Sequence, residues 1–542
     1  MTEYCIALDI GTSGLRCQAL DAETGETVAT AVTARHPIPG MNVIDHVNFA
    51  IVSGEDAANG LIIGAANKLF SSLGIDLSKV RTVAVCGNPF QLSLFQNIEI
   101  RDLAYAGKNM LESLGVVSPP RDGDVLKASD LGLAGMPGAT VMIPPAVTHE
   151  IGADAIAMLM ITDALETKEP CLIVDYGTNA EMALIAGGEV YTGSAAAGPA
   201  LEGQQIERGM LAAPGAIADV DACEGGWRCT VLDGFMKDAE GDVVDPSDGR
   251  VAEEGAMHGR AVGITGTGVV AAICCGMEGG LVDPPAIKSA DGRLHLQDGV
   301  TIKPGDIDEA GKAIGALRAG FLTLLREAGL WVEDVKLAYM SGASGLYVDA
   351  RKALRIGMVV PGAERIIQFG NTSIELARRL ALGRVDMEGL RDFARRLRAT
   401  HCMFATAQTF KDIYSIEYSL WCCGMPMSEY DNMLDIYGIP HLPAPARDPV
   451  IERVSATDLP DTENMPVIML EDTGTVLSGG IEGCTGCGSC VRECPERALS
   501  VSEEGGRHVG RIRSDLCGGT ACRRCERACP GSVLHISPFS VS

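Results

Sequence analysis

The sequence lacks the features that mark membrane, secreted and nucleic-acid-binding proteins. No uninterrupted apolar run approaches the ~18 residues that a membrane-spanning helix needs. Residues 1–20 do not show the basic segment and following apolar stretch of a secretion signal. Basic residues are outnumbered, with 44 Lys and Arg against 71 Asp and Glu, whereas binding a phosphate backbone needs basic surface. These absences predict a cytoplasmic protein without a membrane span and without a nucleic-acid partner.

Cysteine, by contrast, is abundant and unevenly distributed. Eight of the 19 cysteines fall near the C-terminal end, in two runs that each close with Cys-Pro. The first run has the spacing C-x2-C-x2-C-x3-C and consists of Cys484, Cys487, Cys490 and Cys494. The second has the spacing C-x4-C-x2-C-x3-C and consists of Cys517, Cys522, Cys525 and Cys529. The other eleven cysteines show no disulfide framework, which fits a reducing, anaerobic cytoplasm.

This double run resembles the ligand pattern of bacterial ferredoxins that hold two [4Fe–4S] clusters, where the fourth Cys of each run crosses to the other cluster. The resemblance implies one cluster on Cys484, Cys487, Cys490 and Cys529, and a second on Cys494, Cys517, Cys522 and Cys525. A pair of zinc sites is the alternative, because C-x2-C pairs also bind zinc, but two complete runs closed by Cys-Pro favour iron–sulfur clusters. The wider C-x4-C spacing is a two-residue insertion within Gly518–Ala521, which we expect to lie in a loop and to remove no ligand.

A strand–turn–strand motif occurs twice in the rest of the chain. Residues 4–20 read YCIALDIGTSGLRCQAL, and residues 171–193 read CLIVDYGTNAEMALIAGGEVYTG. In each copy an apolar strand ends at an Asp, a Gly-Thr turn follows, and a second strand leaves the turn. The aligned residues are Asp9, Gly11, Thr12 and Ser13 in the first copy, and Asp175, Gly177, Thr178 and Asn179 in the second, 166 positions later. We interpret the pair as an internal duplication.

The motif suits phosphate and magnesium binding. Glycine lets the backbone approach an anion closely, and the N–H groups of the turn and the Thr hydroxyl can point at phosphate oxygens. The Asp can hold Mg²⁺ through water. One copy is weak evidence, because strand–turn–strand units with Asp-Gly are common. The pair resembles the two phosphate loops of the actin–hexokinase–Hsp70 ATPase superfamily, which clamp ATP between two related halves.

Further elements of such a fold are predicted between and beyond the two motifs. The pattern indicates a buried strand running into a Gly-Asn loop at residues 80–94, an apolar helix at 153–159 and a Gly-rich turn opening a helix at 262–272. It further indicates a long amphipathic helix at 302–328, a strand at 337–347 that ends in Gly342-Ala343-Ser344-Gly345, and a turn before a helix at 368–380. His149 is expected to be a capping or surface residue and not a ligand.

The order of segments between Asp175 and Ala377 is similar to the ATPase domain of reductive activators of corrinoid proteins. The matching segments are DYGTNAEM, AAAGPALEG, GITGTG, GDIDEAGKAI, the Gly-rich strand end and GNTSIELA. With the double cysteine run, the resemblance covers essentially the whole chain. It implies an α/β fold, a duplicated actin-like ATPase with an inserted subdomain, followed by a small α+β ferredoxin domain with two [4Fe–4S] clusters. It also implies ATP and Mg²⁺ as cofactors, with Gly342 and Ser344 at the adenosine.

The same resemblance implies an activity, the ATP-dependent reduction of an inactive Co(II) corrinoid protein to the nucleophilic Co(I) state. The implied partners are the corrinoid proteins of methylamine methyltransferase systems in methanogenesis and an unidentified low-potential electron donor. The chain lacks the Asp-x-His-x-x-Gly signature of cobalamin binding, so the corrinoid should belong to a separate protein.

The expected organisation has four parts. Residues 1–165 form the first actin-like half with an inserted subdomain, 166–440 the second half, 441–470 a Pro- and Asp-rich linker, and 471–542 the ferredoxin domain. The pattern departs from the family in two ways. Many relatives carry an N-terminal plant-type [2Fe–2S] domain, which we expect to be absent because the chain starts on the phosphate-loop strand. The turn at Gly342 reads GASG where Gly-Gly-x-Gly is expected.

An ATPase fused to a ferredoxin implies an electron transfer that is uphill or gated, since downhill transfer needs no ATP. A 100 mV shortfall for one electron costs about 2.3 kcal/mol, which ATP binding or turnover can supply. Three alternatives remain. An activator of a radical dehydratase would share one cluster in a dimer, which eight ligands in one chain argue against. An ATP-switched iron–sulfur redox sensor is the second. The third, a sugar kinase with an accessory ferredoxin, lacks a convincing catalytic Asp.

The charge distribution adds one observation. The chain carries a net charge of −27, yet residues 481–542 contain eight Arg, no Lys and seven Asp or Glu. The ferredoxin segment is therefore near neutral on an acidic protein. This is either an ordinary solvated surface or a docking face for an acidic redox partner.

Overall fold

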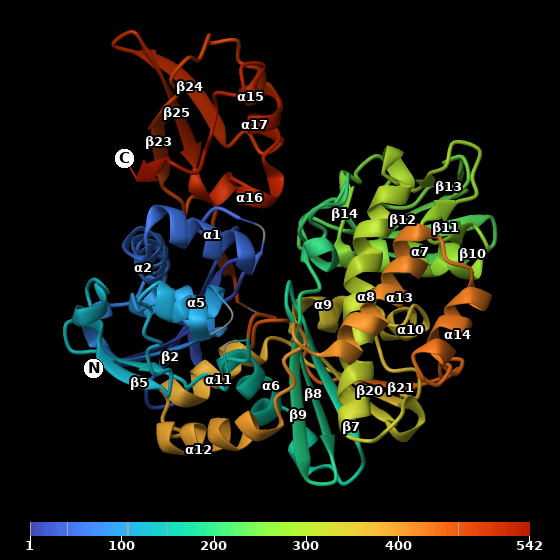
Figure 1. Cartoon of the computed structure of the whole chain (residues 1–542), viewed down its shortest axis with the longest axis horizontal. Helices are drawn as coiled ribbons and strands as arrows, with labels where there is room; N and C mark the ends of the chain where they lie inside the picture. Colours follow the sequence, from blue (N-terminus) through green and yellow to red (C-terminus); the bar gives the residue numbers. More distant parts are fainter. Residues whose placement is uncertain (1, 41, 106–107, 149, 464, 542) are drawn as a thin grey trace. The chain divides into compact units, whose positions relative to one another are not determined.

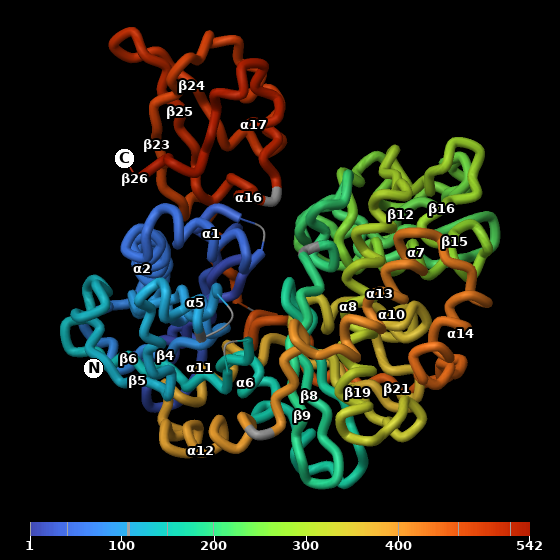
Figure 2. The backbone as a smooth tube through the Cα atoms, in the orientation of Figure 1, coloured from blue at the N-terminus to red at the C-terminus, as the bar shows by residue number. Residues whose placement is uncertain are grey.

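A computed structural model describes residues 2–40, 42–105, 108–148, 150–463 and 465–541 (Figures 1 and 2). The chain forms two compact units. The first comprises Met1–Ala157, Ser373–Arg396 and Asp461–Ser542, and the second Met158–Thr372 and Leu397–Pro460. His149 lies outside the described residues. None of the helices in the described ranges combines the length and the apolar character that a bilayer crossing requires.

The first unit is built on a seven-stranded sheet with the order β22-β3-β2-β1-β4-β6-β5. Its strands are β1 Tyr4–Ile10, β2 Leu15–Asp21, β3 Thr27–Thr33, β4 Val80–Gly87, β5 Asp124–Lys127, β6 Thr140–Ile143 and β22 Val467–Leu470. The first three strands run antiparallel, and β4 runs parallel to β1. Central strand β1 is an almost continuous apolar run because both faces of the sheet are covered.

The second unit repeats this arrangement in a six-stranded sheet with the order β21-β20-β19-β7-β8-β9. Its strands are β7 Cys171–Tyr176, β8 Ala180–Ala186, β9 Glu189–Ala195, β19 Leu337–Ser341, β20 Arg365–Gln368 and β21 Val450–Arg453. Strands β7, β8 and β9 are antiparallel like β1, β2 and β3, and β19 is parallel to β7 as β4 is to β1. The topology therefore confirms the duplication that the two Asp-x-Gly-Thr motifs predicted.

Helices surround both sheets. In the first unit these are α1 Val43–Ser53, α2 Glu55–Ser72, α3 Pro89–Gln96, α4 Arg101–Ala104, α5 Lys108–Ser113 and α12 Met387–Leu397, with α6 Ala153–Ile161 and α11 Thr372–Ala381 at its borders. In the second they are α7 Gly266–Glu278, α8 Pro304–Glu327, α9 Gly342–Tyr347, α10 Ala350–Arg355, α13 Gln408–Cys423 and α14 Met427–Ile436. The sequence indicated four of these helices, α6, α7, α8 and α11. Residues 89–94 and 342–347, expected as a loop and as the end of a strand, instead belong to helices α3 and α9. The long amphipathic helix predicted over 302–328 is α8, which packs along α13 and brings Gly311 against Trp421.

A separate five-stranded sheet is inserted into the second half, with the order β13-β12-β11-β10-β14. Its strands are β10 Ala216–Cys223, β11 Gly226–Leu232, β12 Asp238–Val244, β13 Val251–Glu253 and β14 Gly263–Ile264. Two short pairs follow: β15 Val282–Asp283 with β16 Ala286–Ile287, and β17 Leu294–His295 with β18 Thr301–Ile302. The motifs did not indicate this inserted sheet of the second half.

The C-terminal domain has a four-stranded sheet with the order β24-β25-β23-β26. Its elements are β23 Val476–Gly480, β24 Leu499–Glu504, β25 Arg507–Arg513, β26 Ser540–Val541, α15 Ser489–Arg492, α16 Gly519–Cys522 and α17 Arg524–Arg527. A small core of Leu477, Leu499, Ile512 and Phe539 joins the sheet to the helices. Residues 441–470, expected as a linker, contribute strand β21 to one large sheet and strand β22 to the other. Parallel pairing with β20 and β3 supplies the backbone partners that a free linker would lack.

Candidate cluster and nucleotide sites

Four cysteines of the ferredoxin domain line one cavity of about 190 Å³. Three belong to the first run, Cys484, Cys487 and Cys490, and the fourth is Cys529 from the second run. Apolar side chains from Ile481, Val491, Val533 and Leu534 complete the walls. The structure therefore brings together the set that the crossing rule of two-cluster ferredoxins assigns to one cluster.

Tight turns place these thiols. Gly486 and Gly488 have φ values of 70°, in the left-handed region, so the chain can turn between Cys484 and Cys490. Helix α15 then carries Cys490 inward, where the residue is 8% exposed. Backbone N–H groups approach two sulfurs, from Gly486 to Cys484 Sγ at 3.4 Å and from Ala498 to Cys494 Sγ at 3.2 Å. Such N–H···S contacts stabilise negative charge on a thiolate and tune the potential of a bound cluster.

The second set of four cysteines is also brought together. Burial raises the pKa of Cys517 to about 12, and the nearby thiols of Cys525, Cys522 and Cys494 contribute to this shift. Burial likewise raises the pKa of Cys525 to about 11, with Cys494 and Cys522 again contributing. Cys494, from the first run, therefore lies among the thiols of the second run.

Both sets fit iron–sulfur clusters chemically. Burial raises the pKa of Cys490, and its neighbours Cys484 and Cys529 add to the effect. Four thiolates crowded in such surroundings repel one another, so they need positive charge at the centre of the set. A bound iron cluster supplies that charge, and binding and deprotonation are then coupled.

The first phosphate-loop candidate connects β1 to β2. Asp9, at the end of β1, is 3% exposed, and Arg16 Nη1 lies 3.4 Å from its carboxylate. The turn closes through a hydrogen bond from Gly11 N to Gly14 O of 3.0 Å. Asn88 caps α3 by accepting from Gln91 N, and its Nδ2 donates to Thr12 Oγ1 at 3.5 Å. Asp9 is thus contacted from β2, and Thr12 from the N-cap residue of α3.

A second carboxylate, that of Asp154, lies near Asp9 and was not among the site residues that the sequence indicated. Asp154 is the one charged residue of the apolar helix α6 and lies in its first turn. Burial raises its pKa to about 6, and the negative charge of Asp9 adds to this shift while the N–H of Ala155 opposes it. The buried thiol of Cys86 has its pKa raised by burial and by both carboxylates. Two neighbouring carboxylates offer the oxygen ligands that divalent cations such as Mg²⁺ take. The feature of the sequence that could have indicated Asp154 is its position as a single Asp in an otherwise apolar helix.

The second phosphate-loop candidate lies at the equivalent end of the other sheet. Ser341 Oγ donates to Asp175 Oδ2 at 3.3 Å, and Gly342 sits so close that an added Cβ would lie 2.5 Å from Asp175 Oδ1. Gly342 has a φ of 78°, so this position requires glycine for two reasons. Asp175 is therefore in direct contact with the start of the GASG segment at Gly342.

The remaining residues of this set are held by the short helix Pro199–Glu202. Thr178 Oγ1 donates to Glu202 Oε1 at 3.0 Å, and Ser344 Oγ donates to Leu201 O at 3.2 Å. Gly198 N donates to Thr178 O at 2.9 Å. Gly177 and Asn179 lie in the same turn between β7 and β8. The candidates of the first copy belong to one unit, and those of the second copy and the GASG turn belong to the other.

A shallow groove between α15 and α17 carries positive charge. It is lined by Ser489, Arg492, Glu493, Arg524, Arg527 and Ala528. Arg492 donates to Cys487 O at 3.1 Å and Arg527 to Cys522 O at 2.6 Å. Arg492 is thereby attached to the loop of the first cysteine run, and Arg527 to the loop of the second.

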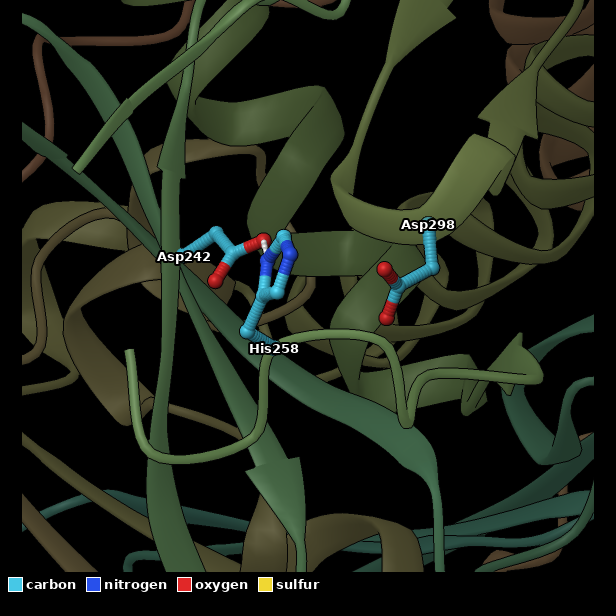
Figure 3. A group of neighbouring side chains, drawn as sticks. All are labelled: Asp242, His258 and Asp298. Carbon is cyan, nitrogen blue, oxygen red and sulfur yellow. Dashed lines mark hydrogen bonds and ion pairs between the residues drawn. The ribbon is translucent and has the colours of Figure 1, made fainter. Parts of the chain in front are cut away.

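Asp242, His258 and Asp298 form a further group of ligand-type side chains, in the inserted subdomain (Figure 3). Asp242 Oδ2 pairs with His258 Nδ1 at 2.8 Å, and Asp242 Oδ1 accepts from Gly255 N at 2.9 Å. Asp298 accepts from the N–H groups of Gly259 and Ala261. The hydrogen bond to Asp242 raises the pKa of His258. These hydrogen bonds attach the loop at 254–261 to β12 and to Asp298, which accounts for the group structurally.

Comparison with known families finds three matching regions along the chain. Residues 4–167 match the family described as the RACo middle region, and residues 169–431 match the C-terminal domain of RACo, the ASKHA domain. Residues 483–533 match the 4Fe-4S dicluster domain. The ATPase fold and the iron–sulfur domain are therefore both present.

Individual relatives agree. A "[Co(II) methylated amine-specific corrinoid protein] reductase" of Methanosarcina barkeri is 47% identical over 515 residues, covering 95% of each chain. The "Corrinoid activation enzyme RamQ" of Eubacterium limosum is 26% identical over 374 residues, covering 66% of this chain and 60% of the relative. Among solved structures, a "Reductive activator for corrinoid,iron-sulfur protein" superposes with a TM-score of 0.63 at 22% identity, over 77% of this chain and 66% of that chain.

Proposed function

The chain belongs to the family of reductive activators of corrinoid proteins, and on that premise we propose that it uses ATP to reduce a corrinoid protein from Co(II) to Co(I). The observation that carries the proposal is the cavity shared by Cys484, Cys487, Cys490 and Cys529 in a chain that also has the duplicated ATPase fold. An electron-carrying site and a nucleotide-binding fold on one chain suit an electron transfer that needs an energy input.

The eight cysteines hold two [4Fe–4S] clusters in this proposal. Cys484, Cys487, Cys490 and Cys529 hold one, and Cys494, Cys517, Cys522 and Cys525 hold the other. The clusters supply one-electron transfer at low potential when bound. Backbone N–H groups stabilise negative charge on Cys484 and Cys494, and apolar side chains line part of the first cavity.

The two phosphate loops bind Mg·ATP in this proposal. The first motif contributes Asp9, Gly11, Thr12 and Ser13, and the second motif and the GASG segment contribute Asp175, Gly177, Thr178, Asn179, Gly342 and Ser344. Asp9 and Asp154 hold Mg²⁺ through water, because hard oxygen ligands suit this ion and it keeps several waters. Binding the cation favours the ionised form of Asp154, so Mg²⁺ binding releases a proton near pH 6.

ATP makes the reduction feasible by favouring one of two states of the chain. A shift from mostly one state to mostly the other needs about 5.5 kcal/mol of differential binding. An electron transfer that is uphill by 100 mV needs about 2.3 kcal/mol, well inside that range. A differential binding energy for ATP of about 2.3 kcal/mol between the two states would therefore match a 100 mV step.

The corrinoid partners proposed for the chain are those of methylamine methyltransferase systems. Support comes from the Methanosarcina barkeri relative, whose name specifies methylated amines and which matches the chain over 95% of both lengths. For the unidentified low-potential electron donor, we propose an acidic protein that docks on the groove of Arg492, Arg524 and Arg527. Opposite charge then guides the donor to this basic groove on an acidic chain, and the association rate of the donor should fall steeply with salt.

The experiment that tests the function is anaerobic visible spectroscopy of a Co(II) corrinoid protein mixed with this protein and a reductant, with and without Mg·ATP. The Co(I) spectrum should appear only when ATP is present. If ATP is hydrolysed and the clusters are intact but no corrinoid protein of the methylamine, methanol or methoxyaromatic systems is reduced, the activator function is refuted and an ATP-switched redox sensor is favoured.

A further inference from the structure

The insertion that widens the second cysteine run is where the ferredoxin domain contacts the first actin-like half. Gly40 N donates to Cys517 O at 2.9 Å. Thr520 Oγ1 donates to Asp45 Oδ1 at 2.5 Å and accepts from Asn48 Nδ2 at 3.3 Å. Asp45 and Asn48 belong to α1, which lies beside α16 (Figure 1). The Thr520 hydroxyl therefore acts as both a donor and an acceptor in hydrogen bonds to α1.

Two glycines allow this close approach. A Cβ added to Gly519, whose φ is 60°, would lie 2.9 Å from Gly40 Cα and 3.3 Å from Asp45 Cβ. A Cβ added to Gly40, whose φ is 141°, would lie 2.4 Å from Asp45 Cβ. The insertion thus fits its partner as closely as the interior of a domain does. A C-x2-C loop would be two residues shorter and could not place both Gly519 and Thr520 here.

The same helix is connected to the first phosphate loop by buried side chains. His46, next to Asp45 on α1, is fully buried, and its Nδ1 lies 2.8 Å from Gln91 Nε2. Gln91 is fully buried on α3, the helix that Asn88 caps. Asn88 in turn donates to Thr12 Oγ1. A path therefore leads from Thr520 through the neighbouring residues Asp45 and His46 of α1 to Gln91 of α3. From there it continues through Asn88 to the hydroxyl of Thr12, which we assign to phosphate binding.

Two stacked, buried histidine rings lie on this connection. His36 stacks on His46 with ring centroids 4.2 Å apart, and burial lowers the pKa of His36 to about 3 and that of His46 well below its ordinary value. Both rings are therefore neutral at physiological pH. Within the described ranges, His46 Nε2 is buried without a hydrogen-bond partner. A buried polar atom that lacks a partner costs stability.

We propose that the two-residue insertion couples the first phosphate loop to the cluster of Cys494, Cys517, Cys522 and Cys525, so that ATP binding changes the reduction potential of that cluster. The proposal rests on the ATP and cluster sites assigned above. A phosphate that engages Thr12 competes with Asn88 for the hydroxyl and shifts the start of α3. Gln91, His46 and Asp45 pass this shift to Thr520. Because Thr520 lies between Cys517 and Cys522, its displacement changes the backbone dipoles around the sulfurs, and these dipoles set the potential.

Linkage makes the proposal measurable without the corrinoid protein. If ATP changes the reduction potential, reduced and oxidised protein must bind ATP with different affinities, in the same ratio. A tenfold affinity ratio corresponds to 59 mV for one electron. The probe is a non-hydrolysable Mg·ATP analogue, titrated anaerobically into oxidised and reduced protein, with a potentiometric EPR titration of the clusters alongside.

Thr520→Val keeps the size of the side chain and removes both hydrogen bonds to α1. The wild-type protein should show an affinity ratio of about tenfold, within the usual range of coupling between sites, and Thr520→Val should bring the ratio close to one with full cluster content. Gln91→Met, far along the chain from every cysteine ligand, should lower the ratio in the same way. Thr485→Val is the matched control, since Thr485 lies between the first two cysteines of the other run, and it should keep the wild-type ratio.

Equal affinities of oxidised and reduced wild-type protein would overturn the coupling, and so would a wild-type ratio in both Thr520→Val and Gln91→Met. ATP-dependent Co(I) formation is assayed in the same preparations. If ATP still promotes Co(I) formation although oxidised and reduced wild-type protein bind ATP with equal affinity, the coupling is refuted and the activator function stands. If the affinity ratio is present but ATP never promotes Co(I) formation, the coupling stands and the activator function fails.

Discussion

Replacing Asp154 by Asn should stabilise the protein at neutral pH and weaken magnesium binding. Burial and the charge of Asp9 raise the pKa of Asp154 to about 6, against 3.8 for an exposed Asp. Below pH 3.8 the carboxyl is protonated in both the folded and the unfolded chain and contributes nothing. As the pH rises, the unfolded chain ionises first, so the folded state loses relative stability between about pH 4 and pH 6. Above that window the full cost is present.

The size of the cost follows from the shift. A difference of about 2.2 pKa units at 1.36 kcal/mol per unit gives about 3 kcal/mol at pH 8. At pH 5 the same pKa values give about 1.6 kcal/mol. These are upper figures, because the Asp154 side chain keeps some contact with solvent. Asn has nearly the shape of Asp and carries no charge, so Asp154→Asn removes the cost at both pH values.

The assay is urea unfolding of the Mg²⁺-free protein, followed by circular dichroism at pH 5 and pH 8. The stabilisation by Asp154→Asn should be larger at pH 8, by about 1.4 kcal/mol. Calorimetric titration with Mg·ATP should show weaker binding by the variant and no proton release near pH 6. A variant that is equally stabilised at both pH values, or that is destabilised at pH 8, would refute the reasoning about Asp154.

Three further substitutions test other parts of the molecule. Cys490→Ser should remove the cluster of the 190 Å³ cavity and abolish Co(I) formation, while calorimetry still detects ATP binding; normal activation by a variant whose iron content is reduced would contradict the assigned ligand. Asp175→Ala should weaken Mg·ATP binding at least about tenfold, or 1.4 kcal/mol, with iron content unchanged; unchanged affinity would remove Asp175 from the site. Glu417→Ala should destabilise the second unit by about 3–5 kcal/mol in urea unfolding, because Arg318, 3.2 Å away, is left buried without its partner. The exposed Glu364, paired with a lysine at 2.7 Å, is the control, and its replacement by Ala should cost less than about 1 kcal/mol; similar effects at both positions would argue against the buried pair.

Local sequence determined the parts of this protein whose geometry is set within a few residues. The spacing of each cysteine run determines which three thiols share a loop, and the Asp-x-Gly-Thr turns follow from an apolar strand that ends at glycine. The amphipathic period of residues 302–328 indicated α8 to within a turn. Repetition of the motif also predicted the duplication that the two sheets display.

Tertiary structure decided the associations between distant segments, because these depend on strand pairing and domain packing that no local pattern encodes. Strands β21 and β22 belong to two different sheets, although their segment is rich in Pro and Asp and suggested a linker. Asp154 lies beside Asp9 because β1 and the start of α6 meet in the folded unit, 145 positions apart in the sequence. The insertion before Cys522 suggested only a tolerated loop, and its contact with Asp45 exists because the ferredoxin domain packs on α1. Sequence thus determined which chemical groups each segment offers, and packing determined which of those groups meet.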